Sequence, residues 1–288
     1  MSTIRKLMIS DKEDVLEISR HIWDGHDYLP HIFDKIMNDC SSHIFGAEVN
    51  GKIMGVANLR LVEEGKIGWM EALRVHPEVR GLGIARKLTE RLVDEAKQLG
   101  VEKLRYATAF DNDASLKLAS NIGMKKVDEF AIRWFNYSDT KDHNIIASQL
   151  QQVSGKEFYK CLTGQSKVDT KGHIVYDWKV IDVTLKGLED LEESVEYWVE
   201  KSGEILLSAS IGILHYSNHG SAWDFTIYAS NRETFLSQMV CHLERMVVHN
   251  TAVGSCIVQP EFESILLHEF KFSDIDDTTK MLLLERQL

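Results

Sequence analysis

The chain has 288 residues, 44% of them hydrophobic, so it is long enough to bury one large core or two ordinary ones. Its formal net charge of −11 disfavours nonspecific binding to nucleic acid, because the phosphate backbone attracts cationic proteins. No apolar run could span a membrane, and the first residues lack the apolar core of a signal peptide, so we expect no membrane association. The 4 cysteines lack the spacing of a disulfide framework or a zinc site, which fits a reducing cytoplasm.

The charge is unevenly distributed along the chain. Residues 1–140 carry 20 basic and 22 acidic side chains, whereas residues 141–288 carry 13 and 22. An acidic half could attract a cationic acceptor, but a solvated surface that keeps the protein soluble is the simpler interpretation.

Hydrophobic periodicity and turn residues divide residues 1–137 into strands and helices. Two of the strands meet at Asn50-Gly51, a strong signal for a two-residue hairpin. The longest helix ends at Gly100, a residue type that often follows a helix. In chain order we expect a strand at 4–9, a helix around 15–22, a short helix after Pro30, strands at 44–49, 53–61 and 67–75, a helix at 82–99, a strand at 103–110, a helix ending near 123 and a strand at 127–135.

The segment Arg80-Gly81-Leu82-Gly83-Ile84-Ala85 joins a predicted strand to the longest predicted helix. Two glycines at such a junction allow a tight turn and a close approach of the backbone to a ligand. The helix that follows offers free N–H groups and the positive end of its dipole to an anion such as phosphate. A dinucleotide fingerprint would need a third glycine where Arg86 stands, and the Gly-Lys-Ser/Thr of a phosphate loop is absent.

The same segment fits the pattern Arg/Gln-x-x-Gly-x-Gly/Ala through Arg80, Gly83 and Ala85. It resembles the acyl-CoA signature of the GNAT family of N-acetyltransferases, and the order of elements over residues 3–137 is the order expected of that family. The resemblance implies an α+β fold with a mixed central sheet flanked by helices, and acetyl-CoA as the acyl donor. It also implies that backbone N–H groups hold the pyrophosphate of acetyl-CoA; these belong to Val79, Arg80, Gly81, Leu82, Gly83, Ile84 and Ala85.

The strand before this loop is expected to carry further site residues. By resemblance, the backbone of Leu73 and Val75 binds the pantetheine arm, and an N–H group of this strand stabilises the oxyanion of the tetrahedral intermediate. Glu71 stands where family members place a carboxylate that can take the proton of the amine. Strict alternation would place Trp69, Glu71, Leu73 and Val75 on one face. The alternative for Glu71 is an ordinary charge on a solvated strand face.

Two positions after the next strand complete the comparison with the family. Asn112 stands where an Asn side chain holds the pantetheine amides, although Asp-Asn-Asp before a helix is also good capping chemistry. Ala119 occupies the position of the family's tyrosine, which protonates the departing thiolate. Ser115, Ser120 or water could substitute for it.

The segment Trp23-Asp24-Gly25-His26-Asp27-Tyr28-Leu29-Pro30 joins the first two predicted helices, where this family binds the acceptor. Its Gly-x-Asp-Tyr-Leu-Pro motif, together with Leu73-Arg74-Val75 and the glycine segment, resembles the histidine N-acetyltransferase branch of the family. That branch acetylates the α-amine of a free amino acid. We therefore expect acceptor contacts, with helix capping or turn packing as the alternative for each side chain, from Trp23, Asp24, His26, Asp27 and Tyr28.

A polar segment at 138–144 is the predicted linker between a domain at 1–137 and a second domain at 145–288. The second domain is expected to contain an acidic helix at 188–198, strands at 205–216 and 223–228, a helix at 233–248 capped by Asn231, a strand at 253–258, a short helix after Pro260 and a final strand-like stretch. This order fits a degenerate GNAT-like repeat as well as a different α+β domain. No glycine cradle precedes its long helix, so we expect it not to bind CoA.

The sequence predicts a cytoplasmic acetyl-CoA-dependent N-acetyltransferase whose acceptor is the primary amine of a small molecule, plausibly a free amino acid. The amine would attack the thioester directly, and no metal is expected, because the histidines show no ligand spacing. The alternatives are a noncatalytic acyl-CoA-binding sensor or interaction module, and an enzyme that acetylates a protein or peptide amine. The sequence does not decide whether the protein forms a homodimer.

Overall fold

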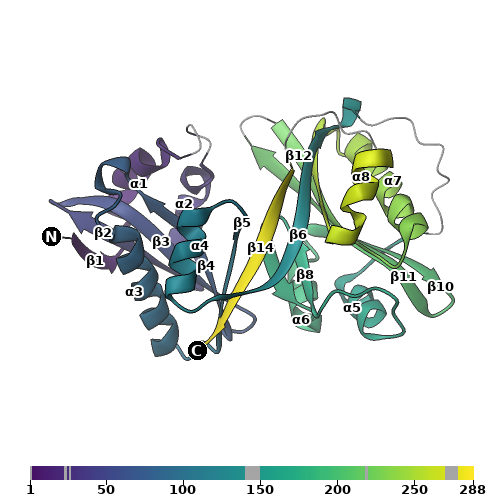
Figure 1. Ribbon diagram of the computed structural model, residues 1–288, viewed down its shortest axis with the longest axis horizontal. Coiled ribbons are helices and arrows are strands. Elements are labelled where there is room, and N and C mark those ends of the chain that lie inside the picture. Colours follow the sequence, from purple (N-terminus) through teal and green to yellow (C-terminus); the bar gives the residue numbers. More distant parts are fainter. Residues whose placement is uncertain (1, 23–24, 26, 140–149, 218–219, 270–277) are drawn as a thin grey trace. The chain divides into compact units, whose positions relative to one another are not determined.

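The computed structural model describes the chain except residues 1, 23–24, 26, 140–149, 218–219 and 270–277 (Figure 1). The chain divides into two compact units, one of Met1–Asp128 with Leu283–Leu288 and one of Glu129–Leu282. Most of the predicted linker at 138–144 lies outside the described residues, and the predicted boundaries at 137 and 145 remain a prediction. None of the described helices is long and apolar enough to cross a membrane.

The first unit contains the predicted elements in the predicted order. The hairpin turn at Asn50-Gly51 has the positive φ angles, 52° and 79°, that a two-residue turn requires. The elements are β1 (Ser2–Lys6), η1 (Ile9–Asp11), α1 (Lys12–Ser19), α2 (Leu29–Asn38), β2 (Ser42–Val49), β3 (Lys52–Val62), β4 (Ile67–Val75), η3 (Pro77–Val79), α3 (Ile84–Gln98), β5 (Lys103–Ala109), α4 (Asp113–Asn121) and the start of β6 (Lys125–Asn136).

The helices of the first unit cover both faces of a mixed sheet in the order β1-β2-β3-β4-β5. Two separate apolar clusters show this. Val15 of α1 and Phe33 of α2 pack with Ala72 of β4, whereas Leu88 of α3 packs with Met70 of the same strand. Strand β4 thus contributes residues to both layers, as a strand between two helical layers should.

Strand β4 has two irregularities that shape the sheet around it. Ala72 has a φ of 57°, and the pairing of β4 with β3 shifts its register opposite this point, which marks a β-bulge. Strand β4 also pairs with the parallel strand β5 through only Ile67–Trp69, which face Lys103–Arg105. Beyond these pairs the two strands lie unpaired with each other, so the sheet opens between their carboxyl ends.

The last residues of the chain complete the first unit. The C-terminal part of β14 (Thr278–Gln287) follows β5 in the sheet. Its Glu285 accepts a hydrogen bond of 2.7 Å from Nε of Arg105, a side chain that is only 1% exposed. A buried guanidinium needs such a partner, because an uncompensated buried charge is strongly destabilising. The sequence did not predict this return of the chain to the first unit.

The strands of the second unit follow the order β14-β6-β13-β12-β11-β10-β7, and β8 pairs with β9 in a separate two-stranded sheet. The predicted strand–strand–helix–strand series is present. Its further elements are η4 (Tyr137–Asp139), β7 (Gln151–Val153), α5 (Gly155–Thr163), β8 (His173–Tyr176), β9 (Lys179–Asp182), α6 (Leu185–Leu191), β10 (Val195–Ser202), β11 (Ile205–Ser217), β12 (Gly220–Ala229), α7 (Arg232–Val248), β13 (Val253–Val258), η5 (Pro260–Phe262) and α8 (Glu263–Glu269).

The predicted acidic helix at 188–198 is wrong. The helix α6 ends at Leu191, and β10 begins at Val195. In this strand Val195, Tyr197 and Val199 are buried at every second position, which is the pattern of a half-buried strand. The acidic residues of the segment obscured this alternation.

A chain of buried polar side chains runs through the second unit between α7 and β11. The indole N–H of Trp223 donates to Nδ1 of His242 at 3.2 Å, so Nε2 carries the imidazole proton and donates to Ser210 Oγ at 2.7 Å. Ser210 donates in turn to Oε1 of Gln238, and Gln238 donates to Ser208 Oγ. Every donor in this chain therefore meets an acceptor, which is what makes its burial tolerable.

Acid should destabilise the second unit through His242. Burial lowers the pKa of this imidazole from 6.5 to about 3, so between these values the unfolded chain binds more protons than the folded one. The stabilisation is complete above pH 6.5 and is lost as the pH falls, with a slope of up to about 1.4 kcal/mol per pH unit. We expect urea unfolding between pH 4 and 7.5 to show a steeper loss for the wild type than for His242→Gln, which cannot titrate. Parallel curves for the two proteins would contradict this assignment.

Candidate active site

The loop between β4 and α3 has the geometry of an anion cradle. Gly81 and Gly83 have φ angles of 79° and 77°, in the left-handed region that favours glycine. A Cβ atom added to either glycine would meet no atom within 4 Å, so both face open space. The loop is held against the strand by Arg80, whose Nε donates to the carbonyl of Val75 at 3.2 Å.

The N-terminus of α3 lacks a side-chain cap. Its N-cap residue is Gly83, and no acidic side chain occupies the first turn. Among the hydrogen bonds of the described residues, none is donated by the N–H groups of Gly81, Gly83 or Ile84. These groups are free to bind an anion, and the positive end of the helix dipole adds to the attraction.

The other predicted cradle residues divide into two groups. The N–H groups of Val79, Arg80 and Leu82 donate within the loop itself, to His76, Pro77 and Val79. Val79 is also buried in the core of the first unit. These three residues therefore shape the turn, while Gly81, Gly83 and Ile84, together with Ala85 in the first turn of α3, present the backbone to a ligand.

In the second unit the corresponding helix, α7, is capped, and the two parallel strands beside it stay paired. Asn231 caps α7, and its Oδ1 accepts the N–H of Thr234 at 3.0 Å. Strands β12 and β13, which are parallel like β4 and β5, pair along six consecutive positions, from Ala222 with Val253 to Ile227 with Val258. At this place, the described part of the second unit thus has neither the exposed helix terminus nor the opening between strands that the first unit has.

A pocket lies where the sheet opens between β4 and β5. Its walls are mostly apolar and come from β4, β5, α3 and α4. The lining residues are Ala57, Met70, Glu71, Leu73, Thr89, Leu92, Tyr106, Ser115, Leu118, Ala119, Ile122 and Met124. A largely apolar pocket with a few polar groups is the usual form of a small-molecule site.

The carboxylate of Glu71 is held by polar neighbours in the wall of this pocket. Nδ2 of Asn58 donates to it at 3.0 Å, and Nη2 of Arg60 lies 3.5 Å away. Its side chain is 15% exposed, so it is accessible without being fully solvated. The expected strict alternation along β4 is wrong, because the bulge at Ala72 lets Leu73 pack on the same side as Met70.

Two polar atoms beside Glu71 remain unpaired. Oδ1 of Asn58 and Nε of Arg60 are buried and have no hydrogen-bond partner among the described residues. Buried polar groups are nearly always hydrogen-bonded in native proteins, so such orphans mark a place where a ligand or water is bound. One acceptor and one cationic donor thus lie next to the carboxylate of Glu71, although neither residue is among those that line the pocket.

Ala119 lies on α4 and Asn112 at its N-cap, and each has a structural consequence. Ala119 is buried in the pocket wall, and the nearby hydroxyls of Tyr106 and Ser115 share a hydrogen bond of 2.8 Å. Asn112 caps α4, with its Oδ1 accepting the N–H of Ser115 at 3.2 Å. The sequence analysis named Ser115 as a substitute acid but missed Tyr106, because a Tyr on a strand carries no spacing signal.

Of the predicted acceptor-binding residues, Asp27 and Tyr28 are described, whereas Trp23, Asp24 and His26 lie outside the described residues. Both oxygens of Asp27 accept from Arg74, at 3.1 Å from Nε and 3.0 Å from Nη2, and its side chain is fully buried. The guanidinium of Arg74 lies over the ring of Tyr28 at 5.2 Å. Asp27 thus fixes Arg74, and through it Tyr28, beside the strand that carries Glu71.

The first unit has the fold of an acetyltransferase domain, and the loop before α3 has the geometry of an anion cradle. Residues 11–124 match the model of the acetyltransferase (GNAT) family, and the chain therefore carries a GNAT-family domain. Histidine N-acetyltransferases of Oreochromis niloticus and Xenopus tropicalis are 29% and 33% identical over 75 and 73 residues. These matches cover 26% and 25% of this chain, and the chain spans only 22% of the length of each relative.

Solved structures resemble the whole chain in fold. A protein of Thermoplasma acidophilum, provisionally named an acetyltransferase, has a TM-score of 0.65 at 13% identity and is covered completely, as is 99% of this chain. A tandem GNAT protein from the clavulanic acid biosynthesis pathway has a TM-score of 0.63 at 10% identity, with 100% of this chain and 98% of that chain covered. These likenesses agree with a second GNAT-like domain.

Proposed function

We propose that the protein transfers the acetyl group of acetyl-CoA to the primary amine of a small molecule, and that this molecule is a free amino acid. The observation that carries the proposal is the uncapped N-terminus of α3 behind two left-handed glycines, next to a pocket that contains Glu71. The pyrophosphate would bind at the cradle. The pantetheine arm would enter where β4 and β5 separate.

The reaction follows from the placement of these groups. The neutral amine attacks the thioester carbonyl, its nitrogen forms the new bond to carbon, and Glu71 accepts the proton that the nitrogen loses. A backbone N–H of β4 beside the bulge at Ala72 would stabilise the negative oxygen of the tetrahedral intermediate. The carbon–sulfur bond then breaks, and the CoA thiolate leaves with the electron pair and takes up a proton.

The hydroxyl pair of Tyr106 and Ser115 is our candidate for the source of that proton. Both line the pocket beside Ala119, where the family tyrosine is missing. The 2.8 Å bond between them allows one hydroxyl to be reprotonated by the other. We therefore expect this hydroxyl pair to replace the tyrosine that family members have at the position of Ala119.

Replacing Tyr106 by phenylalanine should lower kcat roughly tenfold to a hundredfold while the KM for acetyl-CoA stays within about twofold, because only the proton donor is lost. Ser115→Ala, which leaves the Tyr106 hydroxyl in place, should have the smaller effect. Steady-state kinetics with a thiol reagent would measure both. An unchanged kcat in both variants would leave water as the proton donor.

The amino-acid acceptor is supported by the two orphan polar atoms. An α-amino acid carries an ammonium group and a carboxylate on one carbon. The acceptor Asn58 Oδ1 and the carboxylate of Glu71 suit the amine, and the cationic donor Arg60 Nε suits the carboxylate. The similarity to proteins named histidine N-acetyltransferase points to the same class.

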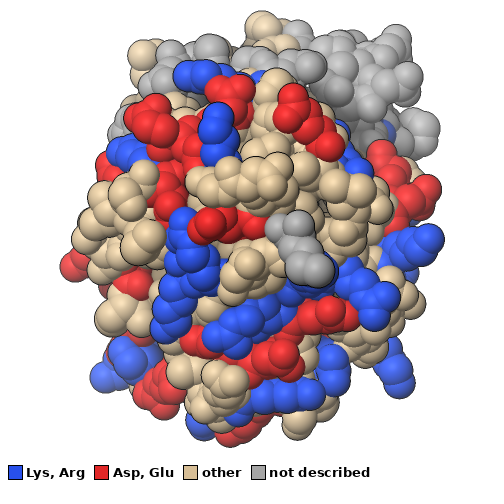
Figure 2. Space-filling view, turned by 90° about the vertical axis from the view of Figure 1, so that its left-hand side faces the viewer, with Lys and Arg blue, Asp and Glu red and all other residues tan. Residues whose placement is uncertain are grey.

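A small acceptor also fits the surface of the protein. Basic and acidic side chains are intermixed over the face shown in Figure 2, without the single sign of charge that a nucleic-acid surface would need. We place the protein in the cytoplasm, where acetyl-CoA and free amino acids are both present. We expect the second unit to bind no CoA, because α7 is capped and β12 and β13 are fully paired.

Thiol release from acetyl-CoA, measured against free amino acids, their amides, polyamines and short peptides, tests the proposal. We expect turnover with one or a few free amino acids and much less with their amides, which lack the carboxylate. Calorimetry should show one acetyl-CoA bound per chain. Binding without turnover on any amine would favour an acyl-CoA sensor, and turnover on peptides alone would favour a protein acetyltransferase.

A further inference from the structure

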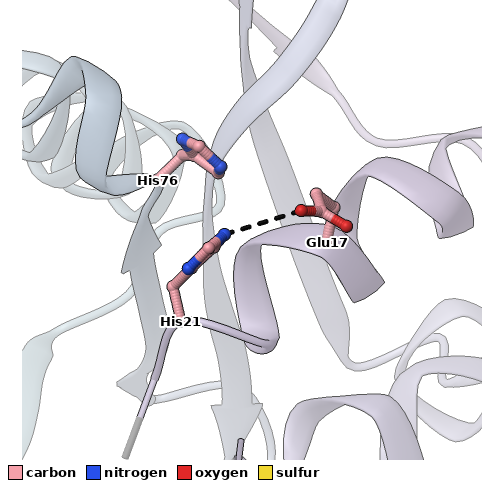
Figure 3. A group of neighbouring side chains, drawn as sticks. All are labelled: Glu17, His21 and His76. Atoms are coloured by element: carbon pink, nitrogen blue, oxygen red, sulfur yellow. Dashed lines mark ion pairs between the residues drawn. The ribbon is translucent and has the colours of Figure 1, made fainter. Parts of the chain in front are cut away.

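Three side chains that the proposed reaction does not use converge beside the acyl-CoA loop (Figure 3). Glu17 belongs to α1, His21 follows that helix by two residues, and His76 joins β4 to η3. One ligand atom from each lies within 4.8 Å of the others. Nε2 of His21 is 3.5 Å from Oε1 of Glu17, and the two imidazole rings are 4.9 Å apart at an angle of 83°.

Two imidazoles and a carboxylate form a donor set suited to a divalent transition metal. Zinc bonds to such atoms at about 2.0–2.2 Å, so two ligands on one tetrahedral ion lie roughly 3.3–3.5 Å apart. The separation of His21 and Glu17 already matches this spacing. His76 would need only a small side-chain movement to complete a three-ligand site with an open position.

The other contacts of these residues leave the facing atoms available. Oε2 of Glu17 is held by Arg20 at 2.5 Å, which leaves Oε1 toward His21. Nδ1 of His76 accepts the backbone N–H of Glu78 at 3.3 Å and lies 4.0 Å from the Glu78 carboxylate. A metal at Nε2 of His76 would move the ring proton from Nε2 to Nδ1, which would then give up the N–H of Glu78 and donate to the Glu78 carboxylate instead.

The burial of the three groups suits a site that exchanges its ion with solvent. The side chains of Glu17 and His21 are 49% and 43% exposed, whereas that of His76 is 11% exposed. An ion could therefore enter from the surface and reach a partly buried imidazole. The sequence analysis missed this group because His76 lies 55 positions after His21, and only the fold brings them together.

We propose that Glu17, His21 and His76 bind a divalent transition metal, with Zn²⁺ as the best match. The ion would connect the end of α1 to the residue that caps η3 and begins the acyl-CoA loop, and it would stabilise that connection. It has no part in the acetyl transfer described above. The proposal does not depend on which amine the enzyme acetylates.

The test is a Co²⁺ titration of tag-free, chelator-treated full-length protein, followed by displacement with Zn²⁺. Co²⁺ bound to two histidines and a carboxylate absorbs visible light, so binding is seen without any activity assay. We expect one ion per chain. His21→Ala and Glu17→Gln should each weaken binding at least about tenfold, because a ligand is lost. These two side chains are exposed, so the variants should fold normally, which circular dichroism would verify.

Two histidine variants serve as controls. His31→Ala removes an exposed imidazole of α2 outside the cluster and should leave the affinity unchanged. His215→Ala removes the imidazole of a second grouping, Asp177, His215 and Asp224 in the second unit, and should also leave it unchanged. Three outcomes would overturn the proposal. These are no visible band with the wild type, affinities of His21→Ala and Glu17→Gln that equal the wild-type affinity, or loss of binding in His215→Ala alone.

Discussion

Replacing Gly83 by valine should weaken acetyl-CoA binding on the order of a hundredfold while the protein remains folded. The added side chain would occupy the open space that both glycines face, where we place the pyrophosphate. The φ of 77° is also unfavourable for a β-branched residue, so the backbone N–H groups would turn away from their present direction. Isothermal titration of acetyl-CoA and of CoA would measure the loss.

Gly100→Val is a matched control for this change. Gly100 follows the other end of α3, has a similar φ of 73°, and likewise faces open space. The variant should lose a similar amount of stability, about 1–2 kcal/mol, because the left-handed conformation is strained in both. Its affinity for acetyl-CoA should not change. Equal affinities in the two variants would remove the cradle as the binding site.

Glu71→Gln should lower kcat by about a hundredfold or more near neutral pH, because glutamine cannot accept the proton of the amine. The amide oxygen can still accept the hydrogen bond from Asn58, so the pocket should keep its shape. The KM for acetyl-CoA should change little. The deficit should shrink at high pH, where more of the free amine is already deprotonated.

The control for this variant is Glu48→Gln. Glu48 of β2 is paired with Arg5 at 2.7 Å, so it tests the loss of a carboxylate from an arginine ion pair away from the pocket. Its kcat should equal that of the wild type. If Glu71→Gln also retained full kcat, the amine would have to lose its proton to solvent.

Most of the first unit could be predicted from its sequence, because its signals are local. The Asn50-Gly51 turn, the period of α3 and the glycines of the cradle each fix a short stretch of backbone without help from distant residues. The turn between β4 and α3 was predictable for the same reason. The acidic segment at 188–198 was predicted wrongly because its many acidic residues concealed the alternation of Val195, Tyr197 and Val199.

What the sequence could not predict depends on contacts between distant residues. The bulge at Ala72 interrupts the alternation of side chains between the two faces of β4, and no glycine in the sequence marks its position. The pairing of Asp27 with Arg74 and the hydroxyl pair of Tyr106 and Ser115 join residues on separate elements. Such contacts are set by the packing of helices against the sheet, and no local pattern encodes them.

The place of Leu283–Leu288 in the first unit has a consequence for biosynthesis. The ribosome makes residues 1–128 first, yet it must add the whole second unit before Glu285 exists to neutralise Arg105. Until then the edge of β5 is uncovered and Arg105 lacks one of its carboxylate partners, although Glu63 lies 3.6 Å from it, and the uncovered edge exposes the nascent chain to aggregation. The unit that is translated first is thus completed last, and we expect a nascent chain halted before residue 283 to depend on chaperones.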